Sequence, residues 1–425
     1  MNVKEELSHF IKQYGGKLLG SGTYGCVFGP NYKCNINDIR DENLISKIIP
    51  KSASYEEYYN IIKLNIHLID SYKNFFIIPL NICDLKEEFL NEEFDSCPMV
   101  ANGSYEKDDL FNIIQPYAGL DMHKIITHKN LLNEYIPDND KLILHLLNLL
   151  VGIGLLNKND CVHRDIKPAN ITMLKGELAK FIDYGLSTKY KKSILDKSGM
   201  LDFDWDWAST DYVYWPRDLK ILSSSENNGM RNEIENLLID KSQEESVVII
   251  MKETAKLFKL YSDYSLHLDQ EYKQSQFKSL FEFLIDVFIK KTFDNDAFDI
   301  SGHAIQTKLD VFSLGQSFSE IFKRSRIQLS DETLKTKLHQ LIVSMVSLHP
   351  LKRPTIRECI ERFVSLIPDN IMTKYTDEFD KLFNIIREQL EIEVNVYTPQ
   401  SESDYGSDSE SESESEIEFD LSDED

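Results

Sequence analysis

The sequence predicts an α+β fold of two lobes, a small β-rich N-terminal lobe followed by a larger helical lobe. Roughly the first hundred residues consist mainly of short apolar runs bounded by turn residues, which are typical of strands. From Asn139 onward most segments show the apolar spacing of helices. The chain has 425 residues, 42% of them hydrophobic, which is enough for two lobes with a full core.

The N-terminal lobe is expected to cover about residues 12–115. Apolar runs on either side of a glycine-rich turn predict a strand–turn–strand unit, and an apolar run with one lysine predicts a further strand. Apolar residues at helical spacing then predict one helix. The expected elements are strands at 17–19, 26–28 and 44–49, a helix at 55–69, and an acidic surface loop at 84–109.

The C-terminal lobe is expected to cover about residues 120–366. Phe277, Phe281, Leu284 and Phe288 are spaced as on one helix face, which predicts amphipathic helices within residues 218–305. The other expected elements are a buried helix at 142–154, a polar loop at 157–170, a hairpin at 171–182, and helices at 310–323 and 333–348. A C-terminal helix is expected within 367–396.

The acidic residues are concentrated at the C-terminus. Residues 401–425 contain 12 acidic residues and no basic one, so half of the net charge of −24 lies there. Residues 397–425 alternate Ser, Glu and Asp with too few apolar side chains to offset chain entropy, and are predicted to be disordered. The acidic balance argues against nucleic-acid binding and favours partners with basic patches. A monomer is expected.

Cysteines and apolar segments give the expected location. None of the six cysteines forms a C-x-x-C pair, so we expect free thiols in a reducing compartment. The charged N-terminus lacks the apolar core of a signal peptide. The longest apolar stretch, 142–156, is too short to span a bilayer and carries two polar residues. We therefore expect an intracellular, cytoplasmic protein without a membrane partner.

A glycine-rich loop is the first motif with chemical meaning. Residues 20–27 fit the pattern G-x-G-x-x-G-x-V, in which glycines let backbone N–H groups approach phosphate oxygens. A strand follows rather than a helix, which disfavours a Rossmann fold, whereas a plain glycine-rich hairpin stays an alternative. The expected nucleotide-binding residues are Gly20, Ser21, Gly22, Thr23, Tyr24, Gly25, Cys26 and Val27.

Lys47 interrupts the next apolar strand and is the expected partner of the nucleotide phosphates. A carboxylate from the following helix would hold this lysine in place. Glu57 is the preferred candidate, because Ile61 and Leu64 follow it at inward-facing spacing, and Glu56 is the alternative. A lysine facing solvent at a strand edge stays the simpler alternative.

The segment His163-Arg164-Asp165-Ile166-Lys167-Pro168-Ala169-Asn170 fits H-R-D-x-K-x-x-N, and Asp183-Tyr184-Gly185 follows at a loop–hairpin–loop distance. With the glycine-rich loop and Lys47, these motifs resemble the eukaryotic protein-kinase family, and Lys167 resembles its serine/threonine branch. The resemblance covers about residues 12–366 apart from residues 218–305, which are an insertion relative to the family. It implies a bilobal protein-kinase-like fold and transfer of the ATP γ-phosphate to serine or threonine of protein substrates.

The resemblance also implies a role for each residue. Asp165 would accept the proton of the substrate hydroxyl, and Lys167 would neutralise charge on the transferring phosphoryl group. Asn170 and Asp183 would ligate Mg²⁺, or Mn²⁺, through hard oxygen atoms.

Other family landmarks can be placed outside the catalytic loop. Gln115 and Tyr117 lie in a segment that resembles the hinge, whose backbone would bind adenine. Asp121 would bind the ribose, with an ordinary surface aspartate as the alternative. Asp310 resembles the buried aspartate that holds the catalytic loop, and residues 349–355 resemble the closing arginine motif.

The sequence departs from the family pattern in four places. Trp215-Pro216-Arg217 stands where the family has A-P-E, so Arg217 replaces the glutamate that pairs with the closing Arg353, and Asp218 could substitute. Ile45 replaces a smaller alanine beside the adenine. Tyr184 replaces phenylalanine. The insertion 218–305 either recruits a substrate or partner or is a neutral addition.

Two other functions stay open beside the kinase. Loss of the usual glutamate permits a pseudokinase that acts as a binding scaffold through the insertion and tail. A kinase-like enzyme acting on a small molecule is the third reading, although Lys167 and the substrate-site threonine candidate Thr210 argue against it. The composition is rich in Asn, Ile and Lys, and together with these departures it resembles that of kinases encoded by large cytoplasmic DNA viruses. A protist origin is the alternative. A viral protein could be carried in the virion.

Overall fold

The structure is a computed structural model of the 425-residue chain. It describes residues 16–22, 25–38, 40–190, 213–216, 229–264, 270–294 and 302–394. The described residues, which end at Val394, belong to one compact unit. The predicted disordered tail, Thr210, Arg217 and Asp218 lie outside the described residues.

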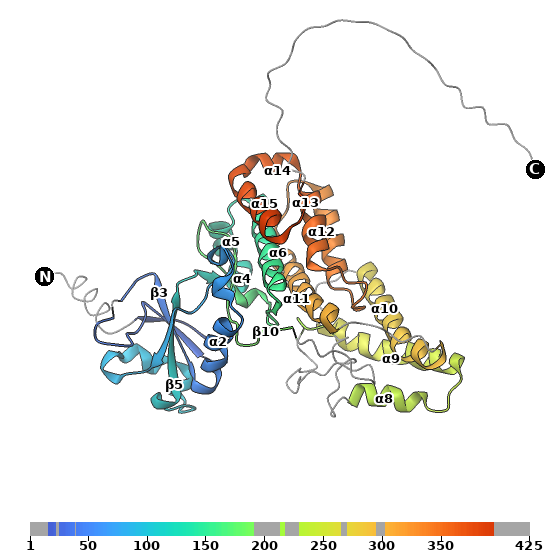
Figure 1. Cartoon of the computed structure of the whole chain (residues 1–425), viewed down its shortest axis with the longest axis horizontal. Helices are drawn as coiled ribbons and strands as arrows, with labels where there is room; N and C mark the ends of the chain where they lie inside the picture. Colours follow the sequence, from blue (N-terminus) through green and yellow to red (C-terminus); the bar gives the residue numbers. More distant parts are fainter. Residues whose placement is uncertain are drawn as a thin grey trace, which may run out of the picture. The chain divides into compact units, whose positions relative to one another are not determined.

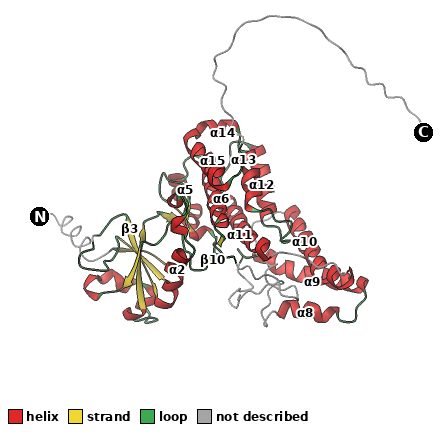
Figure 2. Ribbon diagram, in the orientation of Figure 1, coloured by secondary structure: helices red, strands yellow, loops and turns green. Residues whose placement is uncertain are grey.

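The N-terminal lobe is built on one antiparallel sheet of five strands with the order β1-β2-β3-β5-β4 (Figures 1 and 2). Apolar side chains fill β3 and β5, which lie in the middle of the sheet and are the most buried strands. The strands are β1 (Lys17–Gly22), β2 (Gly25–Gly29), β3 (Leu44–Pro50), β4 (Asn81–Asp84) and β5 (Leu110–Pro116).

Helix α2 (Lys51–Lys63) begins directly where strand β3 ends, with Pro50 as its N-cap residue. The predicted helix at 55–69 therefore lies four residues too far along the chain at its start. It also ends earlier, because Asn65 adopts a left-handed conformation and short 3₁₀ turns follow. These turns are η1 (Ile66–Leu68) and η2 (Tyr72–Asn74).

The segment between β4 and β5 packs on the outer face of the sheet, and its prediction as a surface loop was wrong in this respect. The ring of Phe94 is fully buried and lies 6.1 Å from the ring centroids of both Phe28 and Tyr32. The acidic side chains that suggested a loop surround this apolar anchor. The segment contains η3 (Glu87–Phe89), η4 (Glu92–Ser96), α3 (Pro98–Ala101) and η5 (Lys107–Asp109).

Two disulfides join the same segment and its neighbours to the sheet, so the prediction of six free thiols was wrong. Cys26 on β2 is bonded to Cys97, and Cys34 is bonded to Cys83 on β4. The remaining two cysteines are free and buried. The bonded residues lie 71 and 49 positions apart, so each bond closes a long loop and restricts the unfolded chain. Cysteine usage therefore no longer supports a reducing compartment.

Helix α6 (Leu142–Lys158) runs through the centre of the C-terminal lobe, and every residue from Leu142 to Leu156 is buried. With the preceding 3₁₀ turn it gives a 20-residue segment, 139–158, that is long and apolar enough to cross a membrane by those measures alone, so the argument from length was wrong. The most apolar window is 89% buried inside the protein, as in a core helix.

Short strands beside α6 carry the loops of the site. Strands β6, β8 and β9 form one small sheet, and β7 pairs with β10 in another. The predicted hairpin at 171–182 forms through the antiparallel pair β8–β9. The elements are β6 (Leu120–Asp121), α4 (Met122–Thr127), α5 (Lys129–Tyr135), η6 (Asn139–Lys141), β7 (Cys161–Val162), η7 (Pro168–Asn170), β8 (Ile171–Met173), β9 (Lys180–Phe181) and β10 (Thr188–Lys189).

The later helices pack around α6, with α11, α13 and α15 in contact with it (Figure 1). Helix α11 starts at Gly302, eight residues before the predicted helix at 310–323, and so leads out of the insertion without a break. The helices are α11 (Gly302–Ser325), α12 (Glu332–Met345), α13 (Ile356–Leu366), α14 (Asp369–Lys374) and α15 (Thr376–Leu390). The predicted α+β class is confirmed.

The described part of the insertion is helical and forms part of the lobe's core. One apolar cluster joins the buried side chains of Phe283 and Phe288 to Trp215, Phe312 and Leu348. Polar contacts follow the same surface, since Ser279 Oγ accepts the His349 N–H at 3.1 Å. The elements are α8 (Gly229–Leu238), α9 (Gln243–Tyr264), α10 (Gln270–Leu284) and the π-helix η8 (Ile285–Asp294).

Phe283→Ala is expected to lower the free energy of unfolding by about 3–5 kcal/mol, because the ring is fully buried and its loss leaves a cavity. Urea denaturation measures the change. Met251→Ala on α9 is the matched control, since that side chain is 47% exposed, and should change stability by no more than about 0.5 kcal/mol. Equal, small effects of both substitutions would show that α10 does not support the lobe.

Candidate active site

Strand register determines which side chains of the glycine-rich hairpin face the catalytic side. Val27 pairs with Lys47, and Cys26 pairs with Ile48. Paired residues in a sheet share a face and successive residues alternate, so Val27 and Lys47 lie on one face and Cys26 on the other. The Cys26 side chain is buried in the outer core with its disulfide, so only its backbone could meet a nucleotide, and its assignment as a nucleotide-binding residue stays a prediction.

The three glycines of the loop differ in what they are needed for. A Cβ on Gly25 would lie 2.4 Å from Ile49 Cγ2 and 2.5 Å from the Ile48 carbonyl oxygen, so packing requires glycine there. A Cβ on Gly22 would meet nothing within 4 Å, and one on Gly20 only Lys124 Nζ at 3.7 Å. Packing among the described residues therefore gives no reason for Gly20 and Gly22. Ser21 lies between them, and Thr23 and Tyr24 lie outside the described residues.

Gly25→Ala is expected to lower the free energy of unfolding by about 1–3 kcal/mol, because the added methyl group overlaps backbone atoms of β3. Gly22→Ala should change stability by no more than about 0.5 kcal/mol, because its methyl group has room. Urea denaturation compares the two variants. A larger loss in Gly22→Ala than in Gly25→Ala would contradict this assignment.

Lys47 links the sheet, helix α2 and the loop after β9. Its Nζ lies 2.6 Å from Glu57 Oε2 and 3.6 Å from Asp183 Oδ2. Burial disfavours the charged ammonium, but Asp183 and Glu57 outweigh burial and raise the pKa of Lys47. For Asp183, burial opposes ionisation, yet Lys47 and other positive neighbours lower its pKa. Lys47 is therefore a fixed cation, and Asp183 an ionised carboxylate.

The segment 163–170, the predicted catalytic loop, brings three predicted site residues together. Lys167 Nζ lies 3.1 and 3.0 Å from the two carboxylate oxygens of Asp165. Asn170 Nδ2 donates to Asp165 Oδ2 at 2.7 Å and to the Asp165 carbonyl oxygen at 2.9 Å. Asp165 is buried, and its carboxylate is oriented from two sides.

The Asp310 carboxylate on α11 accepts hydrogen bonds from the backbone of this loop. Its Oδ2 accepts the His163 N–H at 2.6 Å, and its Oδ1 accepts the Arg164 N–H at 2.9 Å. The side chain is completely buried, and burial raises its pKa. Arg164 has a φ of 70°, in the left-handed region that non-glycine residues rarely adopt, so the two bonds hold a strained turn.

The hinge and ribose candidates already have partners in the structure. The Tyr117 N–H donates to the Asn43 carbonyl oxygen at 2.7 Å, so an adenine bond to this N–H would have to displace Asn43. Gln115 is buried, opposite Ile45 in the β3–β5 pair. Asp121 caps α4 by accepting the Lys124 N–H at 2.8 Å, and it also pairs with Lys124 Nζ at 3.0 Å. A ribose hydroxyl would compete with that lysine.

The segment that departs from the family pattern is held by described neighbours. Trp215 Nε1 donates to the Arg164 carbonyl oxygen at 2.7 Å, and Ser313 Oγ donates to the Tyr214 carbonyl oxygen at 2.7 Å. Arg353 is buried, with its guanidinium 5.0 Å from the Phe312 ring and bonded to the Ser347 carbonyl oxygen. The replacement of the usual glutamate by Arg217, and its possible substitute Asp218, concern residues outside the described part.

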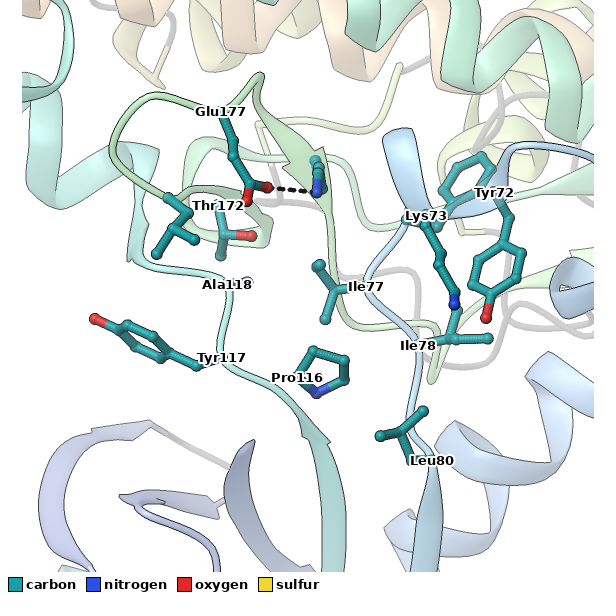
Figure 3. Close-up of a pocket in the computed structure, with 13 residues that line it drawn as sticks. Tyr72, Lys73, Ile77, Ile78, Leu80, Pro116, Tyr117, Ala118, Thr172 and Glu177 are labelled. Atoms are coloured by element: carbon teal, nitrogen blue, oxygen red, sulfur yellow. Dashed lines mark hydrogen bonds and ion pairs between the residues drawn. The ribbon is translucent and has the colours of Figure 1, made fainter. Parts of the chain in front are cut away.

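A separate cavity of about 370 Å³ lies between the hinge, the segment before β4 and the β8–β9 hairpin (Figure 3). Its wall is mainly apolar, and the Glu177–Lys180 ion pair, 2.7 Å long, lies on one side. Lys47, Asp165 and Asp183 do not line it. This cavity is therefore distinct from the catalytic cluster. Its lining residues are Tyr72, Lys73, Phe76, Ile77, Ile78, Leu80, Pro116, Tyr117, Ala118, Thr172, Leu174, Glu177 and Lys180.

The donor atoms at the predicted metal site suit Mg²⁺. Asp183 offers an ionised carboxylate, and Asn170 offers its amide oxygen because its Nδ2 is turned toward Asp165. Within the described residues no group of three or more His, Cys, Asp or Glu could enclose a metal ion. Mg²⁺ is commonly held by one or two protein oxygens together with substrate phosphates and water, and this donor set fits that arrangement.

A comparison with protein families matches residues 15–205 to the protein kinase domain. The segment 15–205 of the chain is therefore similar to a protein kinase domain. The match includes the glycine-rich hairpin, Lys47, the catalytic loop and Asp183, and it ends before the insertion. The α+β architecture of a sheet-based lobe followed by helices is that of this domain.

The curated proteins that resemble this segment are distant. Calcium-dependent protein kinase 4 of Plasmodium falciparum is 28% identical over 197 residues, 45% of this chain and 32% of the relative. Mitogen-activated protein kinase 12 of Mus musculus is 22% identical over 200 residues, 47% of this chain and 46% of the relative. Cell division control protein 7 of Schizosaccharomyces pombe is 27% identical over 175 residues, 41% and 14% of the two chains. The matched segments span less than half of each relative.

Asn60 is a residue of this site that sequence reasoning missed. It lies on α2 one turn after Glu57, and its Nδ2 donates to the carbonyl oxygens of Tyr184 and Gly185 at 3.2 and 3.1 Å. Its spacing of three from Glu57 places both on one helix face, which is the signal that could have found it.

Proposed function

We propose that this protein is a serine/threonine protein kinase that transfers the γ-phosphate of ATP to hydroxyl groups of protein substrates. The observation that carries the proposal is the pair of charge clusters, Lys47–Glu57–Asp183 and Asp165–Lys167–Asn170. The first contains a fixed cation for phosphate oxygens and an ionised metal ligand. The second contains an oriented carboxylate beside a lysine. Phosphoryl transfer needs this combination of positioning and charge neutralisation.

Each side chain has one task in this proposal. ATP with Mg²⁺ supplies the phosphoryl group and the diphosphate leaving group. Asp165 orients the substrate hydroxyl and accepts its proton, and Lys167 neutralises charge beside it. Lys47, kept in place by Glu57, binds the α- and β-phosphates. Asn170 and Asp183 hold the metal.

The glycine-rich hairpin supports nucleotide binding in the same proposal. Among described neighbours, Gly20 and Gly22 have no packing partner that excludes a Cβ, so close approach of a ligand is the remaining physical reason for glycine. Val27 shares the Lys47 face and would cover the base, and Ile45 lies on that face as well. Gln115, Tyr117 and Asp121 are proposed adenine and ribose contacts, each by exchange with an existing partner where one is present.

The experiment is transfer of labelled phosphate from ATP with Mg²⁺ to one basic and one acidic protein, followed by phosphoamino-acid analysis. Labelled phosphoserine or phosphothreonine is expected in at least one protein, and none above background with the Asp165→Asn variant. If the wild-type protein bound nucleotide but transferred no more phosphate than Asp165→Asn to either substrate protein, the binding-scaffold alternative would be favoured. The replacement at Arg217 would then be a candidate cause, because it lies in the predicted substrate-binding segment. Label in phosphotyrosine alone would overturn the serine/threonine assignment.

Two finer proposals concern partners and origin. Large apolar side chains are exposed on the insertion, and we propose this surface for recruiting a protein substrate or partner; the exposed residues are Leu237, Ile239, Val248 and Met251. The acidic tail is proposed to attract basic proteins. The resemblance to kinases of large cytoplasmic DNA viruses, and an intracellular location, stay predictions from the sequence.

A further inference from the structure

The carboxamide of Asn60 joins helix α2 to the loop that follows strand β9. Both hydrogen bonds leave the same nitrogen, which carries two hydrogens and can therefore serve the carbonyl oxygens of Tyr184 and Gly185 together. The partners lie 124 and 125 residues away in the sequence. The side chain is half-buried, so these bonds are partly protected from competing water.

The loop that Asn60 grips is a tight turn with an unfavourable backbone conformation. Asp183 has a φ of 69°, in the left-handed region. The Gly185 N–H donates to the Asp183 carboxylate, and the Ser187 N–H donates to the Tyr184 carbonyl oxygen at 3.0 Å. A strained residue persists only where its surroundings fix it, and Asn60 supplies two of the fixing bonds.

Helix α2 therefore contacts the loop at two points. Glu57 acts through Lys47 on the Asp183 carboxylate, and Asn60 acts directly on the backbone that follows Asp183. The first contact holds the Asp183 carboxylate by charge. The second contact fixes the backbone of the turn and so the orientation of the Asp183 side chain. Loss of the second would leave the contact with Lys47 available but the Asp183 side chain less well oriented.

We propose that Asn60 is a positioning residue that keeps the Asp183-Tyr184-Gly185 turn in the conformation in which Asp183 faces Lys47. Its influence on catalysis rests on the proposed kinase function. Its influence on the turn does not, because both bonds join atoms of the protein itself.

Asn60→Asp is the sharpest test, because it keeps the shape but places a carboxylate, which cannot donate, against two carbonyl oxygens. Hydrogen–deuterium exchange in the full chain without nucleotide should be about tenfold faster at the Gly185 and Ser187 amides, since two hydrogen bonds are lost. Asn60→Leu, which removes the bonds without adding charge, should give a smaller increase at the same amides. Asn133→Asp is the matched control, because Asn133 is exposed on α5, and should leave them unchanged.

A second readout addresses catalysis. With Mg²⁺ and ATP, Asn60→Asp should lower kcat about tenfold and raise the Mg²⁺ concentration for half-maximal activity, with KM for the protein substrate unchanged. Unchanged exchange at the turn in both Asn60 variants would overturn the proposal. So would faster exchange spread evenly over the whole chain, which indicates loss of stability rather than of positioning. An inactive wild-type enzyme would refute the kinase function, while the exchange result would still decide the role of Asn60.

Discussion

Asp165→Asn is expected to lower kcat for phosphate transfer by about a thousandfold, within the range that one positioned acid–base group contributes. The carboxylate is held by Lys167 at 3.0 and 3.1 Å and by Asn170 at 2.7 Å, so it reaches a substrate hydroxyl with a fixed orientation. An amide at this position keeps the size but cannot accept the proton at neutral pH. Lys167 also loses the charge that it faces.

Kinetics at saturating ATP with a phosphorylated protein substrate measure this loss. KM for ATP should change little, because Asp165 is not among the predicted nucleotide contacts. Asp108→Asn, at an exposed position before β5, carries the same chemical change and should leave kcat at the wild-type value. A kcat for Asp165→Asn within threefold of wild type would remove Asp165 from the reaction.

Asp310→Ala is expected to lower the free energy of unfolding by about 3–5 kcal/mol, because it leaves two buried backbone N–H groups without their charged acceptor. Those groups belong to His163 and Arg164, and the bonds are 2.6 and 2.9 Å long. Phosphate transfer should fall as well, since both residues directly precede Asp165 and the Arg164 turn is strained.

Urea denaturation with the matched variant Asp380→Ala tests this expectation. Asp380 is exposed in the middle of α15, and its removal should change stability by no more than about 0.5 kcal/mol. If Asp310→Ala kept both stability and activity, the buried carboxylate would have no supporting role for the catalytic loop.

The parts of the site that could be predicted are those whose functional residues lie close together in short sequence motifs. Asp165, Lys167 and Asn170 lie within six residues, and Asp183 follows one hairpin later, so the motifs and the family resemblance that they carry predicted one cluster. The partner of Lys47 required only helical periodicity to choose between two adjacent glutamates. Periodicity likewise gave the buried helix α6 and the helical character of the insertion.

The missed features depend on contacts between distant segments. Nothing at position 26 or 97 indicates a disulfide, because no local spacing relates residues 71 positions apart. Phe94 is one apolar side chain in an acidic run, and only the tertiary fold shows that it is an anchor. The spacing of Asn60 from Glu57 indicates its helix face, but its partners are backbone carbonyl groups, which the sequence does not identify. The bond from Tyr117 to Asn43 is also invisible for that reason.

The direct junction of β3 and α2 determines how freely Lys47 and Glu57 can move apart. Only ten positions separate the two residues, and no loop intervenes between the strand and the helix. The Pro50 ring restricts φ, so few soft torsions remain at the joint. The segment between Lys47 and Glu57 is therefore short and contains no flexible loop, so little loop entropy is lost when the ion pair forms. Apart from rotation of the two side chains, separating the two charges requires bending the sheet or unwinding the helix's first turn.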